Sequence, residues 1–410
     1  MGNQLLGGLR IITLEIPGRL ADRNVLYIGW YLMNETPAAL QTKSHYQILD
    51  GLRGVAALIV VMFHTCEVYS NGNHSKQVLN HGYLAVDFFF LLSGFVVAYA
   101  YDERWGKMSQ WDFYKRRLIR LQPMVIMGSI IGAALFYFQT GPAFSLVSST
   151  PLWKMLLVML VGFTLLPLLP SMDIRGWNEM HPLDGPAWSL FFEYIANILY
   201  AVGIRKLSNK ALGIFVLLSA GLLVHLAVTA PHGDVIGGWS IDTVQLHVGF
   251  ARLLYPFFAG VLLMRTGKRI HLRGGFAICS LLVIVTLCMP RISGPLWMNG
   301  LYEAFCIIVV FPIIVAIGAG ERISGGLQTR LSKLLGEISY PLYITHYPLI
   351  YVYTAWVVRD KVPVGQGAAV GVLLFIASIT IAYACLKLYD EPVREWLSRR
   401  FLAKAANPPN

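Results

Sequence analysis

The chain has 410 residues, of which 56% are hydrophobic and only 13% are charged. Soluble domains carry about 25% charged residues, so this composition excludes an ordinary soluble protein and indicates a polytopic membrane protein. The formal net charge of +11 would favour nucleic-acid binding in a soluble chain. Here the basic residues cluster in alternate loops, as the positive-inside rule predicts, and we therefore expect a lipid bilayer and no nucleic acid as partner.

Residues 1–45 contain no clean apolar run followed by a small-residue cleavage site, so the sequence predicts a cytoplasmic extension here and no signal peptide. Translation starting at Met33 is an open alternative. The predicted membrane domain covers residues 46–396, and residues 397–410 are expected to form a cytoplasmic tail.

Eleven apolar segments are candidate spans: 48–68, 82–101, 122–139, 155–170, 186–204, 211–230, 244–264, 274–290, 299–318, 338–357 and 365–388. The basic loops 102–121 and 205–210 lie on one side only if an even number of crossings separates them. Residues 155–170 are short and contain two prolines, so this segment is predicted to be re-entrant or interfacial. The sequence thus predicts an all-α, polytopic transmembrane helix bundle of about ten spans plus one re-entrant segment, with both termini cytoplasmic.

Arg53 and His64 lie eleven positions apart in one apolar run, LDGLRGVAALIVVMFHT. An ionisable residue inside a span costs free energy and indicates a functional site. Eleven helical steps return to nearly the same face about 16 Å further along the axis. Histidine is suited to proton transfer near neutral pH. The alternative is that His64 is only a polar residue bonded to a neighbouring helix.

Asp87 lies among aromatic residues in the next apolar segment. One interpretation is an ion pair with an intramembrane arginine that holds two helices together, and the other is a catalytic role. Arg252, in ARLLYPFFAGVLL, is the candidate partner.

The segment FYKRRLIRLQP places Arg116 and Arg120 four residues apart, with Lys115 and Arg117 beside them. Guanidinium groups bind phosphate bidentately, so this cationic collar suits a polyphosphate ligand. The alternative is an anchor that only fixes the orientation of the helix.

The segment PLDGPAWSLFFEY places Ser189 and Glu193 on one helical face. If this helix enters from the outer side, Glu193 lies about one turn below Trp188, at roughly the depth of His64. A carboxylate and an imidazole at matched depth predict a base and its orienting partner. A structural glutamate is the alternative.

Three further features have weaker signals. His346, in GEISYPLYITHYPL, is interpreted either as a substrate contact or as a packed core residue. Glu391 and Arg394 are expected to close the last helix as an end cap with a charge pair. The five cysteines have no CxxC spacing and no histidine partner, so we expect packing roles and no metal site.

Six of these segments, in this order, resemble acyltransferase family 3, which includes bacterial O-antigen and other envelope-glycan O-acetylases. They are LDGLRGVAALIVVMFH (the R-x10-H signature), VDFFFLLSGF, FYKRRLIRLQP, PAWSLFFEY, ARLLYPFFAG and ISYPLYITH. The chain departs from the family at Ala85, where many relatives have glycine before Val-Asp. That change affects only local packing.

The resemblance implies that an acyl group, usually acetyl, moves from acetyl-CoA to a hydroxyl of an extracytoplasmic glycan, at the bacterial inner membrane. Acetyl-CoA is a donor substrate here, and no bound cofactor is expected. The resemblance makes His64 the catalytic histidine, Arg53 its signature partner and Glu193 a supporting carboxylate. Three arginines are implied in the acyl-CoA site: Arg116, Arg117 and Arg120.

Alternatives remain at this point. Intramembrane charges also mark transporters, a non-catalytic scaffold is a third alternative, and a secreted lipid or small molecule is an alternative acceptor. Ser189 is a candidate nucleophile if an acyl-enzyme forms. The sequence leaves the acyl group, the acceptor and the oligomeric state open.

Overall fold

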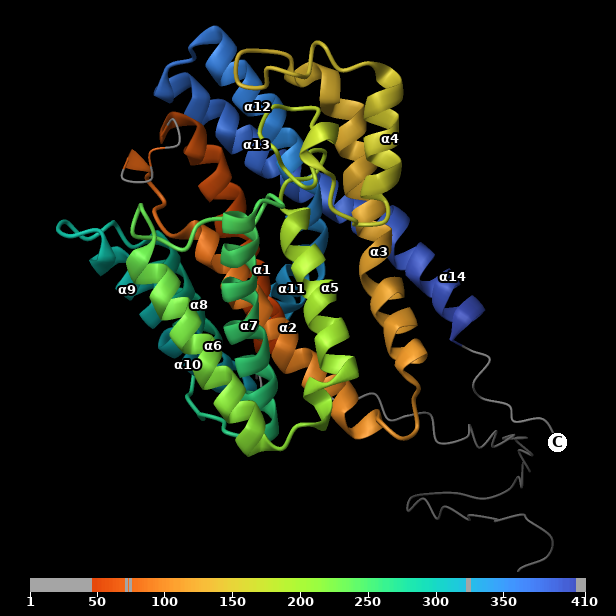
Figure 1. Ribbon diagram of the computed structural model, residues 1–410, viewed down its shortest axis with the longest axis vertical. Helices are drawn as coiled ribbons and strands as arrows, with labels where there is room; N and C mark the ends of the chain where they lie inside the picture. Colours follow the sequence, from red (N-terminus) through yellow and green to blue (C-terminus); the bar gives the residue numbers. More distant parts are fainter. Residues whose placement is uncertain (1–45, 71–72, 74–75, 322–325, 403–410) are drawn as a thin grey trace, which may run out of the picture. The chain divides into compact units, whose positions relative to one another are not determined.

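The computed structural model describes residues 46–70, 73, 76–321 and 326–402. The predicted N-terminal extension, Met33 and most of the predicted tail lie outside the described residues. The described part consists of helices joined by loops and contains no strand, which confirms the predicted all-α polytopic bundle (Figure 1).

The α-helices follow one another along the chain as α1 (Gln47–Glu67), α2 (Ala85–Tyr101), α3 (Gln110–Leu135), α4 (Leu152–Gly162), α5 (Ala187–Val202), α6 (Asn209–Thr229), α7 (Thr243–Thr266), α8 (Gly275–Cys288), α9 (Trp297–Phe305), α10 (Phe311–Gly320), α11 (Gly326–Thr345), α12 (Tyr347–Asp360), α13 (Val364–Cys385) and α14 (Glu391–Phe401). A π-helical segment, Cys306–Val310, joins α9 to α10, and another, Leu386–Asp390, joins α13 to α14.

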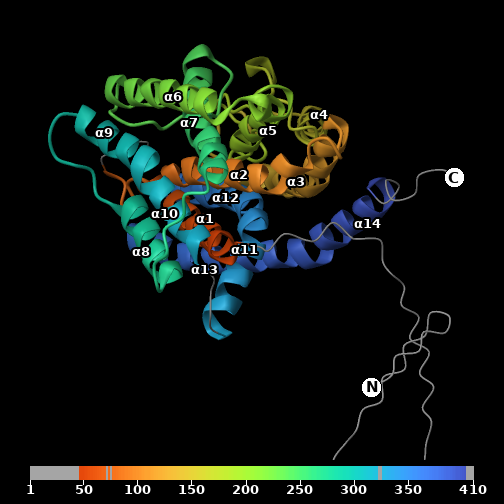
Figure 2. The same cartoon turned by 90° about the horizontal axis from the view of Figure 1, so that it is seen from below.

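Helix α1 lies inside the bundle, where it packs against α2, α8, α10, α11, α12 and α13. Figure 2 shows α1 and α2 surrounded by the other helices when the bundle is seen from below. The residues of the R-x10-H signature are therefore carried by a central helix.

Seven helices of the described part are long and apolar enough to cross a membrane, and α4, α5 and α8 are shorter apolar helices. The eleven residues of α4 extend about 16 Å, half of a hydrocarbon core of about 30 Å. This length supports the prediction that the segment around 155–170 does not cross. The predicted total of about ten through-spans exceeds the seven that length and composition support.

Two predicted boundaries were wrong. The predicted span 338–357 is two helices, α11 and α12, which meet at His346. Pro348, in the first turn of α12, cannot donate a backbone hydrogen bond to the preceding turn, so the helix is interrupted there. The last helix does not end near Glu391 but continues through the π-helical segment to Phe401.

The basic loops gather at one end of the bundle, which we call the basic end. Arg265 Nε donates to Asp102 Oδ2 at 2.7 Å, and Arg265 Nη2 donates to the carbonyl oxygen of Arg205 at 3.1 Å. Arg269 Nη2 donates to the hydroxyl of Tyr46, beside the start of α1, at 2.9 Å. These contacts show that the basic loops lie together at one end of the bundle, as the sequence predicted.

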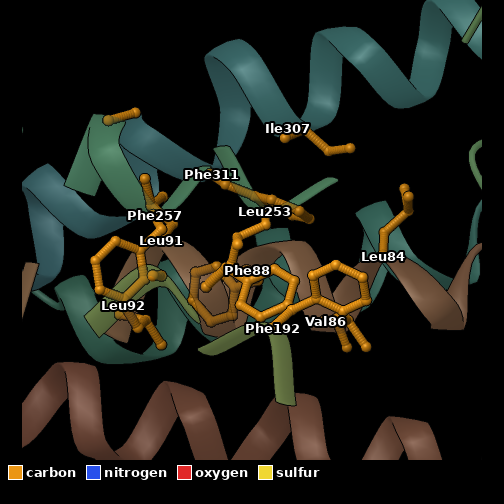
Figure 3. Packing of buried hydrophobic residues seen from close by; sticks show 14 of the residues in the cluster. Leu84, Val86, Phe88, Leu91, Leu92, Phe192, Leu253, Phe257, Ile307 and Phe311 are labelled. Atoms are coloured by element: carbon orange, nitrogen blue, oxygen red, sulfur yellow. The ribbon is translucent and has the colours of Figure 1, made fainter. Parts of the chain in front are cut away.

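Helices α2 and α7 pack with their backbones in close approach. A Cβ atom on Gly94 would overlap the carbonyl oxygen of Phe257, and one on Gly260 would overlap that of Leu91. Small residues at such crossings are typical of membrane helix pairs, because they permit extensive van der Waals contact. Figure 3 shows the buried side chains around this crossing, among them Phe88 and Leu253.

Candidate functional site

A cavity of about 640 Å³ lies between α1, α2, α3, α5, α11 and the α13–α14 junction. The first two turns of α1 line it, so it extends into the bundle from the basic end. Its charged lining residues are Asp50, Arg53, Arg117, Arg120, Glu193, Lys333, Glu337, Asp390, Glu391 and Arg394. Its other end is lined by aromatic and hydroxyl side chains, including Phe89, Ser189 and Tyr343.

Arg53 is fixed in the wall of this cavity. Its Nε donates to Ser339 Oγ at 2.9 Å, and its Nη2 lies 3.3 Å from Asp50 Oδ1. Neither contact involves His64. The two signature residues share one helix, but three turns separate them, so Arg53 belongs to the cavity and His64 to the opposite part of the bundle.

Glu193 also belongs to the cavity, which corrects the predicted pairing with His64. Its Oε1 accepts hydrogen bonds from Ser93 Oγ at 2.6 Å and from Arg117. The prediction failed because residues 181–187 are buried, so α5 begins inside the bundle rather than at its surface, as Figure 1 shows. Every residue of α5 therefore lies closer to the basic end than the sequence predicted. Ser189 and Glu193 do line the same cavity, as their spacing predicted.

The predicted arginine collar is divided by the structure. Arg117 and Arg120 line the cavity, whereas Arg116 is not among its lining residues. Arg117 is held by Glu193, and Arg120 makes no hydrogen bond or ion pair with another described residue. Two of the three predicted phosphate-binding arginines are thus placed where a ligand in the cavity would meet them.

His64 lies near the C-terminal end of α1 with its ring partly exposed. Its Nδ1 lies 2.9 Å from Glu67 Oε2, one turn further along the same helix. A proton on Nδ1 satisfies this contact and leaves Nε2 with the lone pair that a general base requires. Sequence reasoning missed Glu67, although its i,i+3 spacing from His64 was available as a signal.

Two further rings surround His64. The ring centroid of Tyr347 lies 4.7 Å from that of His64, and the centroid of His346 lies 5.6 Å away. His346 Nδ1 lies 2.9 Å from the carbonyl oxygen of Leu342, and its Nε2 is buried without a partner among the described residues. The structure therefore brings the predicted residues His64 and His346 together.

Tyr343 separates the cavity from His64. Its hydroxyl lies 2.8 Å from Ser189 Oγ inside the cavity lining, and its ring centroid lies 6.2 Å from that of His346. The rings of Tyr343 and His346 thus stand between the inner end of the cavity and the imidazole of His64.

Residues 173–175 and 179–186 are buried and form a wall beside this second part of the site. The Tyr351 hydroxyl lies 2.7 and 2.8 Å from the carboxylate oxygens of Glu179, and the guanidinium of Arg175 stacks 3.4 Å from the Tyr351 ring centroid. The rings of Tyr351 and Tyr347 are 4.6 Å apart, which connects this wall to His64. Burial raises the pKa of Glu179 to about 7, although the charge of Arg175 opposes the shift.

Asp87 and Arg252 form the predicted ion pair between α2 and α7. Arg252 Nη2 donates to Asp87 Oδ2 at 2.7 Å, and both side chains are buried. Arg252 also donates to the carbonyl oxygen of Tyr83 at 2.9 Å and lies 5.3 Å from the Trp188 ring centroid. The pair does not line the cavity, so the structure favours the interpretation that it holds two helices together.

Within the described ranges, no group of three or more His, Cys, Asp or Glu side chains is placed to hold a metal ion.

The fold and the site define a multi-pass membrane protein with a charged cavity reaching in from one end. A family model described as an acyltransferase domain matches residues 46–387. The chain therefore belongs to this acyltransferase family. No solved structure matches the chain.

Curated relatives agree with this membership. O-acetyltransferase OatA of Staphylococcus aureus is 24% identical over 372 residues, which cover 85% of this chain and 57% of the relative. YrhL of Bacillus subtilis, whose name assigns it provisionally to peptidoglycan O-acetylation, is 25% identical over 344 residues, covering 77% of this chain and 50% of the relative. Protein 2 in the picA locus of Rhizobium radiobacter is 32% identical over 187 residues, covering 44% of this chain and 93% of the relative. The chain thus spans about half the length of the two O-acetyltransferase relatives.

Proposed function

We propose that this chain is a membrane O-acyltransferase that takes an acyl group from a donor in the cavity and transfers it to a hydroxyl held at His64. The observation that carries the proposal is the pair of sites on the central helix α1. Arg53 lines a charged cavity at the basic end, and His64 with Glu67 lies near the helix's other end. The O-acetyltransferase names of the relatives support the same reaction.

The proposed donor is acetyl-CoA. Its phosphates would meet the guanidinium groups of Arg53, Arg117 and Arg120, which all line the cavity. The positive-inside rule places the basic end in the cytoplasm, where acyl-CoA is present. The termini of the membrane domain are then cytoplasmic, and in a bacterium the membrane would be the inner one.

In the proposed reaction His64 acts as general base. Its Nε2 takes the proton of the acceptor hydroxyl while the hydroxyl oxygen attacks the acyl carbonyl, and the thiolate of CoA leaves. Glu67 stabilises the imidazolium that forms. The acyl group reaches His64 once the rings of Tyr343 and His346 move apart, because these rings close the inner end of the cavity.

The proposed acceptor is a hydroxyl of a cell-envelope glycan. The name of YrhL points to peptidoglycan. His64 lies toward the end of the bundle opposite the basic end, and in the proposed orientation that opposite end faces the extracytoplasmic glycan. A secreted lipid or small molecule is the alternative acceptor.

The test compares base-labile acyl groups on envelope glycans, measured by NMR and by acetate release, in host cells that lack this gene. The cells receive wild type, His64→Ala or the control His225→Ala, which changes an exposed histidine on α6. We expect wild type and His225→Ala to restore the acyl groups and His64→Ala to restore none.

Acyl groups restored by well-inserted His64→Ala would overturn the role of His64 as base. Identical glycans in all cells would overturn the glycan acceptor and direct the same comparison to secreted lipids and small molecules.

A further inference from the structure

Arg394, in the first turn of α14, faces the same cavity as the arginines of α1 and α3. The sequence predicted an end cap at this position. Instead the π-helical segment Leu386–Asp390 continues α13 into α14, and α14 packs against α3. Arg394 is thereby brought to Arg120 from a segment more than 250 residues away in the chain.

The charges of the cavity are unevenly paired. Arg53 is paired with Asp50 at 3.3 Å, Arg117 with Glu193, and Arg394 with Asp390 at 2.9 Å. Arg120 has no such partner among the described residues. Its charged neighbours include the guanidinium groups of Arg53, Arg117 and Arg394, and the nearby Asp390 already binds Arg394. Clustered guanidinium groups repel one another unless an anion lies between them.

Arg394 is also anchored in a way that leaves part of its guanidinium available. Only its Nη1 donates to Asp390 Oδ2, and Nε and Nη2 make no hydrogen bond with any other described residue. Asp390 is itself 1% exposed, so it holds this arginine from below the cavity surface. An anchored guanidinium whose Nε and Nη2 are both free can direct two parallel N–H groups at a pair of phosphate oxygens.

We propose that Arg394 and Arg120 together bind a phosphate group of the acyl carrier, so that the C-terminal helix completes the donor site. The inference rests on the proposed function for the identity of the carrier, coenzyme A. Phosphate binding by the two arginines is a separate property and can be measured without acyl transfer.

The test uses the full chain in detergent and two kinds of ligand. Adenosine 3′,5′-bisphosphate carries phosphate without the thioester, and S-acetylpantetheine carries the thioester without phosphate. We expect Arg394→Gln to raise the Kd for the bisphosphate and the KM for acetyl-CoA on the order of tenfold. This is the size of the effect expected from the loss of one charged hydrogen bond. The KM for S-acetylpantetheine should not change. Arg394→Lys keeps the positive charge but lacks the paired N–H donors of the guanidinium, so its Kd and KM should lie between those of wild type and Arg394→Gln.

The matched control is Arg399→Gln, on the same helix, where Arg399 is exposed and pairs with Glu395. It should leave every constant unchanged. An unchanged Kd for the bisphosphate in Arg394→Gln, or an equal loss with S-acetylpantetheine, would overturn the inference, because the first denies phosphate contact and the second indicates a general structural defect.

The two proposals fail separately. Arg394-dependent binding of the bisphosphate without transfer from acetyl-CoA would sustain the phosphate site and overturn the proposed function. Transfer from acetyl-CoA with the same KM in Arg394→Gln and wild type would sustain the function and overturn the role of Arg394.

Discussion

His64 and Glu67 form a local pair whose two members lie one helical turn apart. Sequence reasoning chose Glu193, on a distant segment, as the partner of His64 and overlooked Glu67 on the same helix. Local spacing was the better guide, because an i,i+3 contact depends only on helix geometry. The distant pairing depended on the depth at which α5 begins.

Glu67→Gln should lower kcat on the order of tenfold or more and leave KM for the donor nearly unchanged, if transfer proceeds as proposed. The amide cannot stabilise the imidazolium that forms on His64 and no longer fixes its tautomer. The measurement is kcat and the KM for the donor, compared between Glu67→Gln and wild type.

The structure supports a direct effect of this substitution on His64, since the two side chains are in contact. Glu395→Gln, at an exposed position of α14, serves as control. An unchanged kcat in Glu67→Gln would remove Glu67 from the site as a positioning residue.

Short and interrupted elements decide where the site residues lie. Residues 179–186 are buried but not helical, so α5 begins inside the bundle and carries Glu193 into the cavity. The break between α11 and α12 places His346 beside His64. In both cases, irregular backbone buried in the protein determines the position of a functional side chain.

Gly94→Ala should destabilise the protein by about 1–3 kcal/mol, because the added methyl group would force the closely packed backbones of α2 and α7 apart. The measurement is the thermal unfolding midpoint in detergent. The control is Gly213→Ala on α6, where an added Cβ meets no atom within 4 Å. Equal midpoints for both variants would show that the approach of α2 and α7 is not tight.

At the scale of the whole molecule, the two halves of the proposed reaction lie toward opposite ends of one bundle. The arginine-lined cavity extends from the basic end, and His64 lies beyond the rings of Tyr343 and His346. Such an arrangement suits a donor and an acceptor on different sides of a membrane.

The proposed orientation predicts opposite labelling of the two ends in intact cells. A cysteine introduced by Val78→Cys, exposed in the α1–α2 connection, should react with a membrane-impermeant maleimide. One introduced by Lys107→Cys, exposed in the α2–α3 loop, should react only after permeabilisation. The background replaces the native cysteines by alanine: Cys66, Cys279, Cys288, Cys306 and Cys385. The reverse pattern would place the cavity on the outer side.

The sequence by itself determined the fold class, most helix positions and the clustering of basic loops, because composition and apolar run length are local properties. It also identified Arg53, Arg117, Arg120 and Ser189 as polar groups worth testing, and all four line the cavity. Intramembrane charge alone was enough to single out the Asp87–Arg252 pair.

Only the tertiary structure decided which of these groups meet. Glu193 joined Arg117 instead of His64, and Arg394 joined Arg120 instead of capping the last helix. Both outcomes depend on where a helix begins or continues within the bundle, on the buried start of α5 and on the π-helical junction before α14. Periodicity fixes the face of a helix on which a side chain lies, whereas packing against other helices fixes its depth, and contact between distant residues requires both.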